Sequence, residues 1–302
     1  MGTRTASGDR KVYRVKSAPF GNPFRAKEAP LPGARKAARA KGRRSLANSV
    51  ALAVSAALFA GSSFLFAMEL IPQIVAHKEI SDIRSFKIEA AQGFLPENRA
   101  YAKRDLPSFE ALSAINKEIV GWIYLDGAEI DHPLVQGSDN DYYLSHTFKK
   151  TENDAGSIFM DFRNANAMTD QNTVIYGHKM KNGAMFGKLL NYRSQEEYEK
   201  SPVASIYTVD GKAYHYQIFA SAVLEESYDY RSPDDGGDFE GFIEKLCSRS
   251  EIQSSAKVKK GDRILTMSTC TPPSVMENGR FAVFAVLLNK GGNDIDLSLV
   301  KP

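Results

Sequence analysis

Hydrophobic and polar positions divide the chain into an N-terminal part with long patterns and a C-terminal part with short ones. Residues 45–68 form a run of 24 positions without a charge, long enough as a helix to cross a hydrocarbon core of about 30 Å. Residues 73–92 also look helical, and Pro107 marks the start of another predicted helix that reaches about Ile115. We therefore predict an apolar spanning helix followed by a helical stalk or a first packed helix.

From Val120 onward the pattern changes to short apolar runs, separated by turn pairs such as Asp126-Gly127 and Asp210-Gly211. Helical interruptions are expected near 184–192 and 238–249. The predicted strands are Gly121–Leu125, Ile130–Val135, Ser157–Asp161, Thr173–Tyr176, Ser205–Val209, Tyr214–Leu224, Asp262–Thr269 and Phe281–Leu288. Roughly eight strands with few helices predict a mostly β fold, a closed or nearly closed mixed barrel.

The charge distribution changes at the uncharged run. The first 44 residues hold thirteen Lys or Arg and two acids, a net charge of +11, so the remainder carries −8 of the total of +3. Arg43 and Arg44 precede the run and Glu69 follows it. By the positive-inside rule we predict a single-pass type II protein of the cell membrane, with residues 1–44 as a disordered cytoplasmic tail and the C-terminal body outside.

A cleaved signal peptide is the alternative to this anchor. The uncharged run is long for a signal peptide, and the leader before it is much too long. We expect the basic tail to lie near anionic membrane lipid, and we expect no nucleic-acid partner, because basic runs flank many membrane anchors.

The two cysteines of the chain, Cys247 and Cys270, do not make a disulfide scaffold. Cys247 continues a helical spacing of apolar residues at positions 239, 242, 243 and 246, which predicts a packed position on the inner face of a helix. Cys270 ends a predicted strand, where a side chain emerges at the rim of a barrel.

Three reactive side chains stand at the ends of predicted strands: Cys270, Arg280 ten residues later, and His178 after an upstream apolar run. A cysteine is nucleophilic as a thiolate, so it needs a cationic or basic neighbour, and His178 is the candidate. A hairpin would bring Arg280 back beside Cys270, where a guanidinium suits an oxyanion. Together these groups supply the parts for thiol-based acyl transfer.

The segments around these side chains resemble the sortase family. Thr173-Val-Ile-Tyr-Gly-His178, continued by Met180-Lys-Asn-Gly-Ala-Met-Phe-Gly-Lys-Leu, resembles its histidine motif. Leu265-Thr-Met-Ser-Thr-Cys270 with Arg280 resembles its cysteine–arginine signature, and the resemblance covers about 115–290. The Met-Phe-Gly continuation and the helix-bearing insertion at 225–256 are most like class B sortases.

This resemblance implies an eight-stranded catalytic barrel over 117–302, with a stalk and N-terminal helices over 69–116. It implies a membrane-anchored cysteine transpeptidase whose Cys270 attacks the Thr carbonyl in a C-terminal sorting motif of a secreted protein. Arg280, with the backbone N–H of Thr271, would stabilise the oxyanion, and His178 would protonate the leaving amine. The amine of a peptidoglycan precursor would then resolve the thioester.

Two alternatives stay open at this point. A pilin-polymerising sortase would use a lysine side chain as acceptor and would carry the same barrel and catalytic residues. A surface adaptor would bind sorting motifs without cleaving them, although the presence of all three reactive side chains argues against it.

Matching class B positions also imply substrate contacts from Tyr176, Ser268 and Asn140. Since residues i and i+2 of a strand share a face, Ser268 should line the same groove as Cys270. Some class B sortases have an acidic residue two positions after the cysteine, where this chain has Pro272. We therefore expect no acidic contribution from that loop, which Pro272 should stiffen instead.

No metal or cofactor is expected. The histidines other than His178 lack metal-ligand spacing (His77, His132, His146 and His215). The acidic residues around the Gly236-Gly237 pair lack the EF-hand pattern, so a solvated loop is expected there (Asp234, Asp235 and Asp238). Trp122 and the Tyr142–Tyr143 pair are predicted to be core residues.

Overall fold

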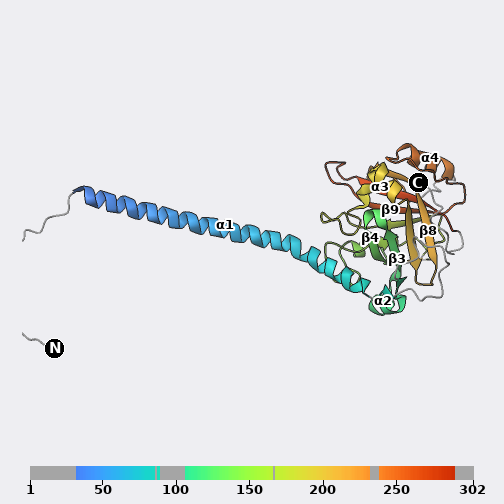
Figure 1. Cartoon of the computed structure of the whole chain (residues 1–302), viewed down its shortest axis with the longest axis horizontal. Helices are drawn as coiled ribbons and strands as arrows, with labels where there is room; N and C mark the ends of the chain where they lie inside the picture. Colours follow the sequence, from blue (N-terminus) through green and yellow to red (C-terminus); the bar gives the residue numbers. More distant parts are fainter. Residues whose placement is uncertain (1–31, 86, 89–105, 166, 232–237, 290–302) are drawn as a thin grey trace, which may run out of the picture. The chain divides into compact units, whose positions relative to one another are not determined.

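A long N-terminal helix and a closed β-barrel are the main parts of the structure, a computed structural model that describes residues 32–85, 87–88, 106–165, 167–231 and 238–289 (Figure 1). By its internal contacts the chain divides into two units, Met1–Phe64 and Leu65–Pro302. The barrel belongs to the second unit. Asp234 and Asp235 of the predicted solvated loop lie outside the described residues, and Asp238 accepts a hydrogen bond from the backbone N–H of Gly241.

Eight strands close the barrel in the order β10-β8-β7-β3-β4-β5-β6-β9. The pairs β4–β5 and β6–β9 are parallel and the other pairs are antiparallel. The strands are β3 Ile119–Leu125, β4 Ile130–Val135, β5 Phe159–Met160, β6 Asn172–Tyr176, β7 Val203–Thr208, β8 Ala213–Leu224, β9 Ile264–Cys270 and β10 Arg280–Leu287. The predicted mixed barrel is confirmed, although β5 has only two of its five predicted residues.

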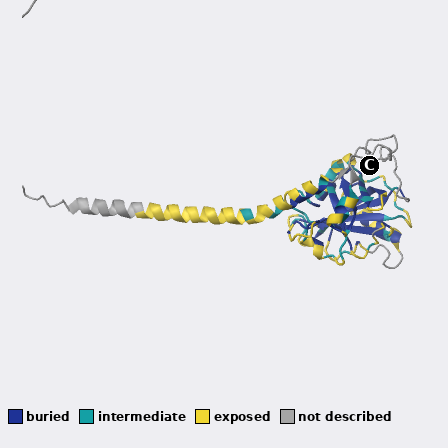
Figure 2. Cartoon of the chain, turned by 90° about the horizontal axis from the view of Figure 1, so that it is seen from below, coloured by how far each residue is buried: buried dark blue, intermediate teal, exposed yellow. Residues whose placement is uncertain are grey.

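The barrel is filled by apolar side chains, and the strands are mostly buried in Figure 2. Trp122 and Tyr143 are fully buried, as predicted for core residues. The prediction is wrong for Tyr142, which is exposed and stacks on the ring of His146 with centroids 4.0 Å apart. Tyr142 and Tyr143 lie in a 3₁₀ turn, so adjacent side chains point in different directions and only one enters the core.

The outside of the barrel at β8, β9 and β10 is covered by a helix. The helix α4 spans Phe239–Ser248, and its buried side chains share a cluster with residues of β8, β9 and β10. These are Phe239, Phe242, Ile243 and Leu246. Cover on both faces explains why β8 is buried along nearly its whole length, where a strand with one wet face would alternate between buried and exposed positions.

The predicted packed position of Cys247 on this helix is wrong, because its side chain is exposed. Successive helical residues are about 100° apart, so Cys247 lies about 90° from the centre of the buried stripe. The spacing from Phe239 suggested the inner face, but Leu246 already occupies the centre of that stripe. Only Leu246 of this neighbouring pair is fully buried.

The helix α1 spans Pro32–Arg84 and continues through Pro72. It contains a stretch long and apolar enough to cross a membrane, whose large hydrophobic side chains are exposed (Figure 2). Residues 32–44, which belong to the tail predicted as disordered, are helical in the structure. Proline at the first helical position and the alanine, lysine and arginine residues that follow favour a helix.

The predicted helix over 73–92 ends earlier, at Arg84, and continues from the apolar run without a break. Beyond it, β1 Lys87–Ile88 pairs with β2 Leu106–Pro107. The helix predicted from Pro107 is α2, Phe109–Ile115, with Ser108 as its N-cap. The interruption expected near 184–192 is a 3₁₀ turn at Leu189–Arg193, followed by α3 at Gln195–Lys200.

The C-terminal part of α1 is hydrogen-bonded to the barrel unit. Glu79, which is 8% exposed, accepts hydrogen bonds from the Thr147 hydroxyl at 3.0 Å and from the Lys149 backbone N–H at 2.9 Å. The side chain of Asn153 donates to the carbonyl of Pro72 at 2.9 Å. These buried contacts attach α1 to the segment that precedes β5.

We expect Glu79→Ala to lower the free energy of unfolding by about 1–3 kcal/mol, because it leaves the buried Thr147 hydroxyl and the part-buried Lys149 backbone N–H without this acceptor. Urea unfolding of the full chain in detergent, followed by fluorescence of the single tryptophan, Trp122, measures the change. Glu110→Ala on the exposed side of α2 is the control. Equal unfolding curves for the two variants would contradict the contact.

We expect both thiols to react with a maleimide in the folded protein, giving two adducts by mass spectrometry. Partial burial raises the pKa of the Cys247 thiol, so its reaction is slower than that of a free cysteine. Cys247→Ser should leave one adduct. A single adduct on the unsubstituted protein would instead support the prediction that Cys247 is packed against the barrel.

Candidate active site

The ends of three neighbouring strands bring the predicted catalytic side chains together. In the antiparallel pair β9–β10, Cys270 lies directly opposite Arg280. In the parallel pair β6–β9, Tyr176 lies opposite Ser268, so His178 and Cys270 each follow two residues beyond the same rung of the ladder. His178, Cys270 and Arg280 line one groove of about 320 Å³.

Cys270 is exposed, and the guanidinium of Arg280 is directed at its sulfur. Nη1 of Arg280 donates to Sγ of Cys270 at 3.0 Å, and Nη2 donates to Oε1 of Glu226 at 3.2 Å. A charged donor at this distance stabilises negative charge on the sulfur or on an atom bonded to it. The second contact limits the orientations of the guanidinium.

Two hydrogen bonds hold the backbone before His178 against β9. The backbone N–H of Gly177 donates to the carbonyl of Ser268 at 3.3 Å, and the hydroxyl of Thr269 donates to the carbonyl of Gly177 at 2.7 Å. A Cβ at position 177 would lie 2.8 Å from the ring of Phe186, which packs on this glycine. The backbone N–H of Phe186 donates to the carbonyl of His178 at 3.0 Å. These contacts explain the glycine before the histidine and the phenylalanine that follows it in the motif.

The imidazole of His178 has a defined orientation. Its Nε2 lies 2.7 Å from the carbonyl oxygen of Leu144. A carbonyl only accepts, so Nε2 carries the proton of this hydrogen bond and Nδ1 is the nitrogen left for proton exchange. The fixed tautomer and the half-buried position suit a group that transfers a proton within the groove.

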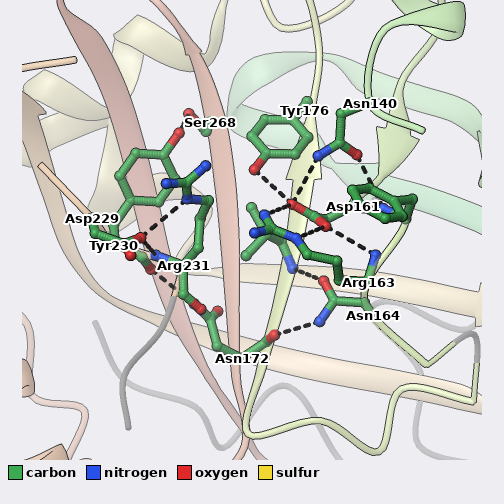
Figure 3. Close-up of polar contacts among 12 residues, drawn as sticks. Asn140, Asp161, Arg163, Asn164, Asn172, Tyr176, Asp229, Tyr230, Arg231 and Ser268 are labelled. Atoms are coloured by element: carbon green, nitrogen blue, oxygen red, sulfur yellow. Dashed lines mark hydrogen bonds and ion pairs between the residues drawn. The ribbon is translucent and has the colours of Figure 1, made fainter. Parts of the chain in front are cut away.

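One wall of the groove is formed by the loop after β8 and is tied to β9 (Figure 3). The hydroxyl of Tyr230 shares a 2.7 Å hydrogen bond with the hydroxyl of Ser268, which lines the groove as predicted from its register with Cys270 and is itself buried. The side chain of Asn172 donates to the carbonyl of Tyr230 at 2.9 Å and accepts from Thr266 at 2.9 Å. The loop and the sheet are thus joined by buried polar contacts.

On the other wall, Tyr176 and Asn140 converge on Asp161 (Figure 3). Burial opposes the ionisation of Asp161, but hydrogen bonds from Arg163, Tyr176 and Asn140 outweigh it and lower the pKa of Asp161 to about 2. Burial, with the charge of Asp161, raises the pKa of Tyr176, so its phenol remains a donor. Tyr176 and Asn140 both line the groove.

Thr271 is the predicted site residue that does not line this groove. Its backbone N–H donates to the carbonyl of Gly279 at 3.1 Å, and its hydroxyl donates to the carbonyl of Met276 at 2.7 Å. Both groups close the loop between β9 and β10. In this structure the Thr271 amide is therefore occupied, and an oxyanion would have to compete with Gly279 for it.

Several residues that line the groove or support it were not predicted as site residues, among them Leu144, Glu226 and Tyr230 in the lining and Asp161 behind it. Leu144 orients His178 through its backbone carbonyl, which no side-chain pattern indicates. Asp161 occurs in the segment Gly156-Ser-Ile-Phe-Met-Asp-Phe-Arg, where the aspartate two residues before an arginine was its only sequence signal. Glu226 and Tyr230 lie in the insertion before the cysteine strand, and its folding over the groove is a tertiary feature.

An exposed thiol, an oriented imidazole and a guanidinium in one groove at the rim of a β-barrel define a thiol-dependent acyl-transfer site. A family model for the sortase domain matches residues 123–288. Sortase B of Listeria monocytogenes is 37% identical over 183 residues, which cover 59% of this chain and 73% of that protein.

Solved structures agree with the sequence comparison. A Staphylococcus aureus sortase B–substrate complex is 34% identical with a TM-score of 0.56, and the match covers 61% of this chain and 85% of that chain. A sortase B complexed with triglycine is 33% identical with a TM-score of 0.54, covering 61% and 86%. The chain belongs to the sortase family and is most like its class B members. Sortases are cysteine transpeptidases, and this chain is an enzyme of that type.

We expect Arg280→Ala to lower kcat about 100-fold, the effect of removing a donor to an oxyanion. Glu226→Gln should change kcat/KM less than about fivefold, because the carboxylate end of its ion pair with Arg280 is exposed. Arg193→Ala, which removes an arginine paired with Glu251 away from the groove, is the control. Steady-state cleavage of a sorting peptide measures all three, and a larger loss in Glu226→Gln than in Arg280→Ala would contradict the assignment.

Proposed function

We propose that this sortase cleaves a C-terminal sorting motif with Cys270 as nucleophile, Arg280 as oxyanion donor and His178 as proton donor and acceptor. The observation that carries the proposal is the 3.0 Å contact between Nη1 of Arg280 and Sγ of Cys270, in a groove that His178 also lines. The thiolate attacks the carbonyl carbon of the motif's threonine, and the carbonyl oxygen becomes an oxyanion beside the sulfur. Nη1 is directed at this position.

The proton balance assigns two roles to His178. As the tetrahedral intermediate collapses, the imidazolium gives a proton to the leaving amine and a thioester remains on Cys270. The incoming amine then attacks the thioester carbonyl, neutral His178 takes the proton that the new amide nitrogen must lose, and the C–S bond breaks to release the Cys270 thiolate. The Leu144 carbonyl holds Nε2–H through both steps, so Nδ1 exchanges the proton.

The donor substrate in this proposal is a secreted protein with a C-terminal sorting motif, and the acceptor is an amine of a peptidoglycan precursor. The solved class B structures with a substrate and with triglycine support a peptide and an amine as partners. The groove, lined by Tyr176, Tyr228 and Tyr230, suits an extended peptide bound through its backbone and apolar side chains.

The enzyme acts, in this proposal, at the outer face of the cell membrane. The apolar part of α1 supports a membrane span, and the cluster of basic residues before it supports a cytoplasmic N-terminus. The catalytic barrel then follows the span on the outer side, where secreted proteins and cell-wall precursors meet. The basic tail contacts the anionic inner leaflet.

Products identify the motif and the acceptor together. The full chain in detergent is incubated with a library of sorting-motif peptides and with one of three acceptors: a glycine oligomer, a diaminopimelate-type amine or a lysine-containing pilin peptide. Mass spectrometry then detects the thioester on Cys270 and the new amide. If the acyl group is transferred only to the pilin lysine, the proposed function becomes pilin polymerisation and not cell-wall anchoring. If peptides bind but none is cleaved, the protein is an adaptor.

We expect Cys270→Ala to abolish cleavage, with no detectable product, and to leave the fold intact, because the side chain is exposed at the end of β9. The matched control is Cys247→Ser, which should retain full activity. Circular dichroism and Trp122 fluorescence check the fold. Turnover by Cys270→Ala at the wild-type rate would eliminate the mechanism.

A further inference from the structure

The side chains of Tyr176 and Asn140, which we predicted as substrate contacts, already have hydrogen-bond partners within the protein. The Tyr176 hydroxyl donates to Oδ2 of Asp161 at 3.0 Å. The amide nitrogen of Asn140 donates to the same oxygen at 3.1 Å, and its amide oxygen accepts from the backbone N–H of Phe162 at 3.0 Å. The polar ends of Tyr176 and Asn140 are therefore turned toward the protein.

Asp161 is the acceptor that these groups share, and its side chain is 3% exposed. It accepts five hydrogen bonds: one from Tyr176, one from Asn140, and three from the backbone N–H, Nε and Nη2 of Arg163. The bonds from Nε and Nη2 are 2.8 and 2.5 Å long, a two-point ion pair that fixes the carboxylate plane. Figure 3 shows the three side chains meeting at this carboxylate.

Asp161 itself does not line the groove, whereas Tyr176 and Asn140 do. With its hydroxyl bound to Asp161, Tyr176 presents its ring to the groove, next to the ring of Phe159 at a centroid distance of 5.4 Å. An aromatic surface in this part of the groove favours an apolar side chain of the peptide over a charged one. The position of that surface depends on the carboxylate behind it.

We propose that Asp161 is a positioning residue for peptide binding: it holds Tyr176 and Asn140 in the orientation that forms an aromatic subsite for the sorting peptide. This inference rests on the proposed function and concerns its binding step. Within the described residues, no hydrogen bond joins Asp161, Arg163, Tyr176 or Asn140 to Cys270, His178 or Arg280. Loss of Asp161 should therefore weaken substrate binding more than the chemical step.

Asp161→Asn retains the shape of the side chain but replaces one acceptor oxygen by a donor. The donors from Tyr176, Asn140 and Arg163 then compete for one oxygen, so at least one of them loses its partner. We expect KM for a cleaved sorting peptide to rise about tenfold, because the free-energy cost of one unsatisfied buried donor corresponds to a change of about that size. We expect kcat to stay within about twofold of wild type.

Tyr176→Phe is the second variant, because it leaves Asp161 with the other four donors and does not depend on the stability of Asp161→Asn. It should raise KM about threefold with kcat unchanged. In the double variant the two effects should not multiply, since both act through one contact. Glu251→Gln, which disrupts a two-point arginine pair with Arg193 away from the groove, is the control and should leave KM unchanged.

The measurements are KM and kcat of the full chain in detergent, together with the rate at which iodoacetamide inactivates the enzyme. The inactivation rate reports on Cys270 and should be the same in the wild type and in every variant. Unchanged KM in both single variants, multiplying effects in the double variant, or a loss confined to kcat would overturn the positioning role. If the wild-type enzyme cleaves no sorting peptide, the proposed function itself is contradicted, and not only the role of Asp161.

Discussion

The parallel hydrogen bonds between β6 and β9 are the constraint on which the site depends. His178 and Cys270 are 92 residues apart, and this pairing brings them to the same rim. A parallel ladder places the C-terminal ends of both strands on one side. A slip of one residue would turn Cys270 to the opposite face of the sheet, so the register is as necessary as the pairing. The bonds of Gly177 with Ser268 and Thr269 fix that register at its last rung.

The other necessary pairing, β9 with β10, is local. Arg280 lies opposite Cys270 because a hairpin returns the chain, and the loop between them is closed by Thr271. Cys270 and Arg280 therefore belong to one hairpin, whereas His178 comes from a segment far away in the sequence. This division explains why the sulfur and guanidinium are in direct contact, while the imidazole is held separately by Leu144.

The strands could be predicted because their apolar runs are short and punctuated by turns, and all eight predicted strands are present. Cys270 and His178 stand out in the sequence because the chain holds only two cysteines and five histidines, and Arg280 because a hairpin places it opposite Cys270. Cys247 was misplaced because a helical pattern defines a stripe only to within about one residue, and the position next to Leu246 falls at its edge. The Asp161 network could not be predicted, since its members come from separate segments and sequence cannot show that their donors are already used inside the protein.

The orientation of His178 is another feature that the side-chain pattern of the sequence could not predict. Leu144 acts through its carbonyl, so the orientation of His178 depends on the path of the backbone and not on the side chain at position 144. That path is held by contacts on both sides: Ser157 donates to the carbonyl of His146 at 2.8 Å, and Thr147 and Lys149 donate to Glu79 of α1. The helix that follows the apolar run is thus part of the support for the imidazole. A barrel without residues 65–84 would retain the strands of the site but lose this buried contact beside the histidine.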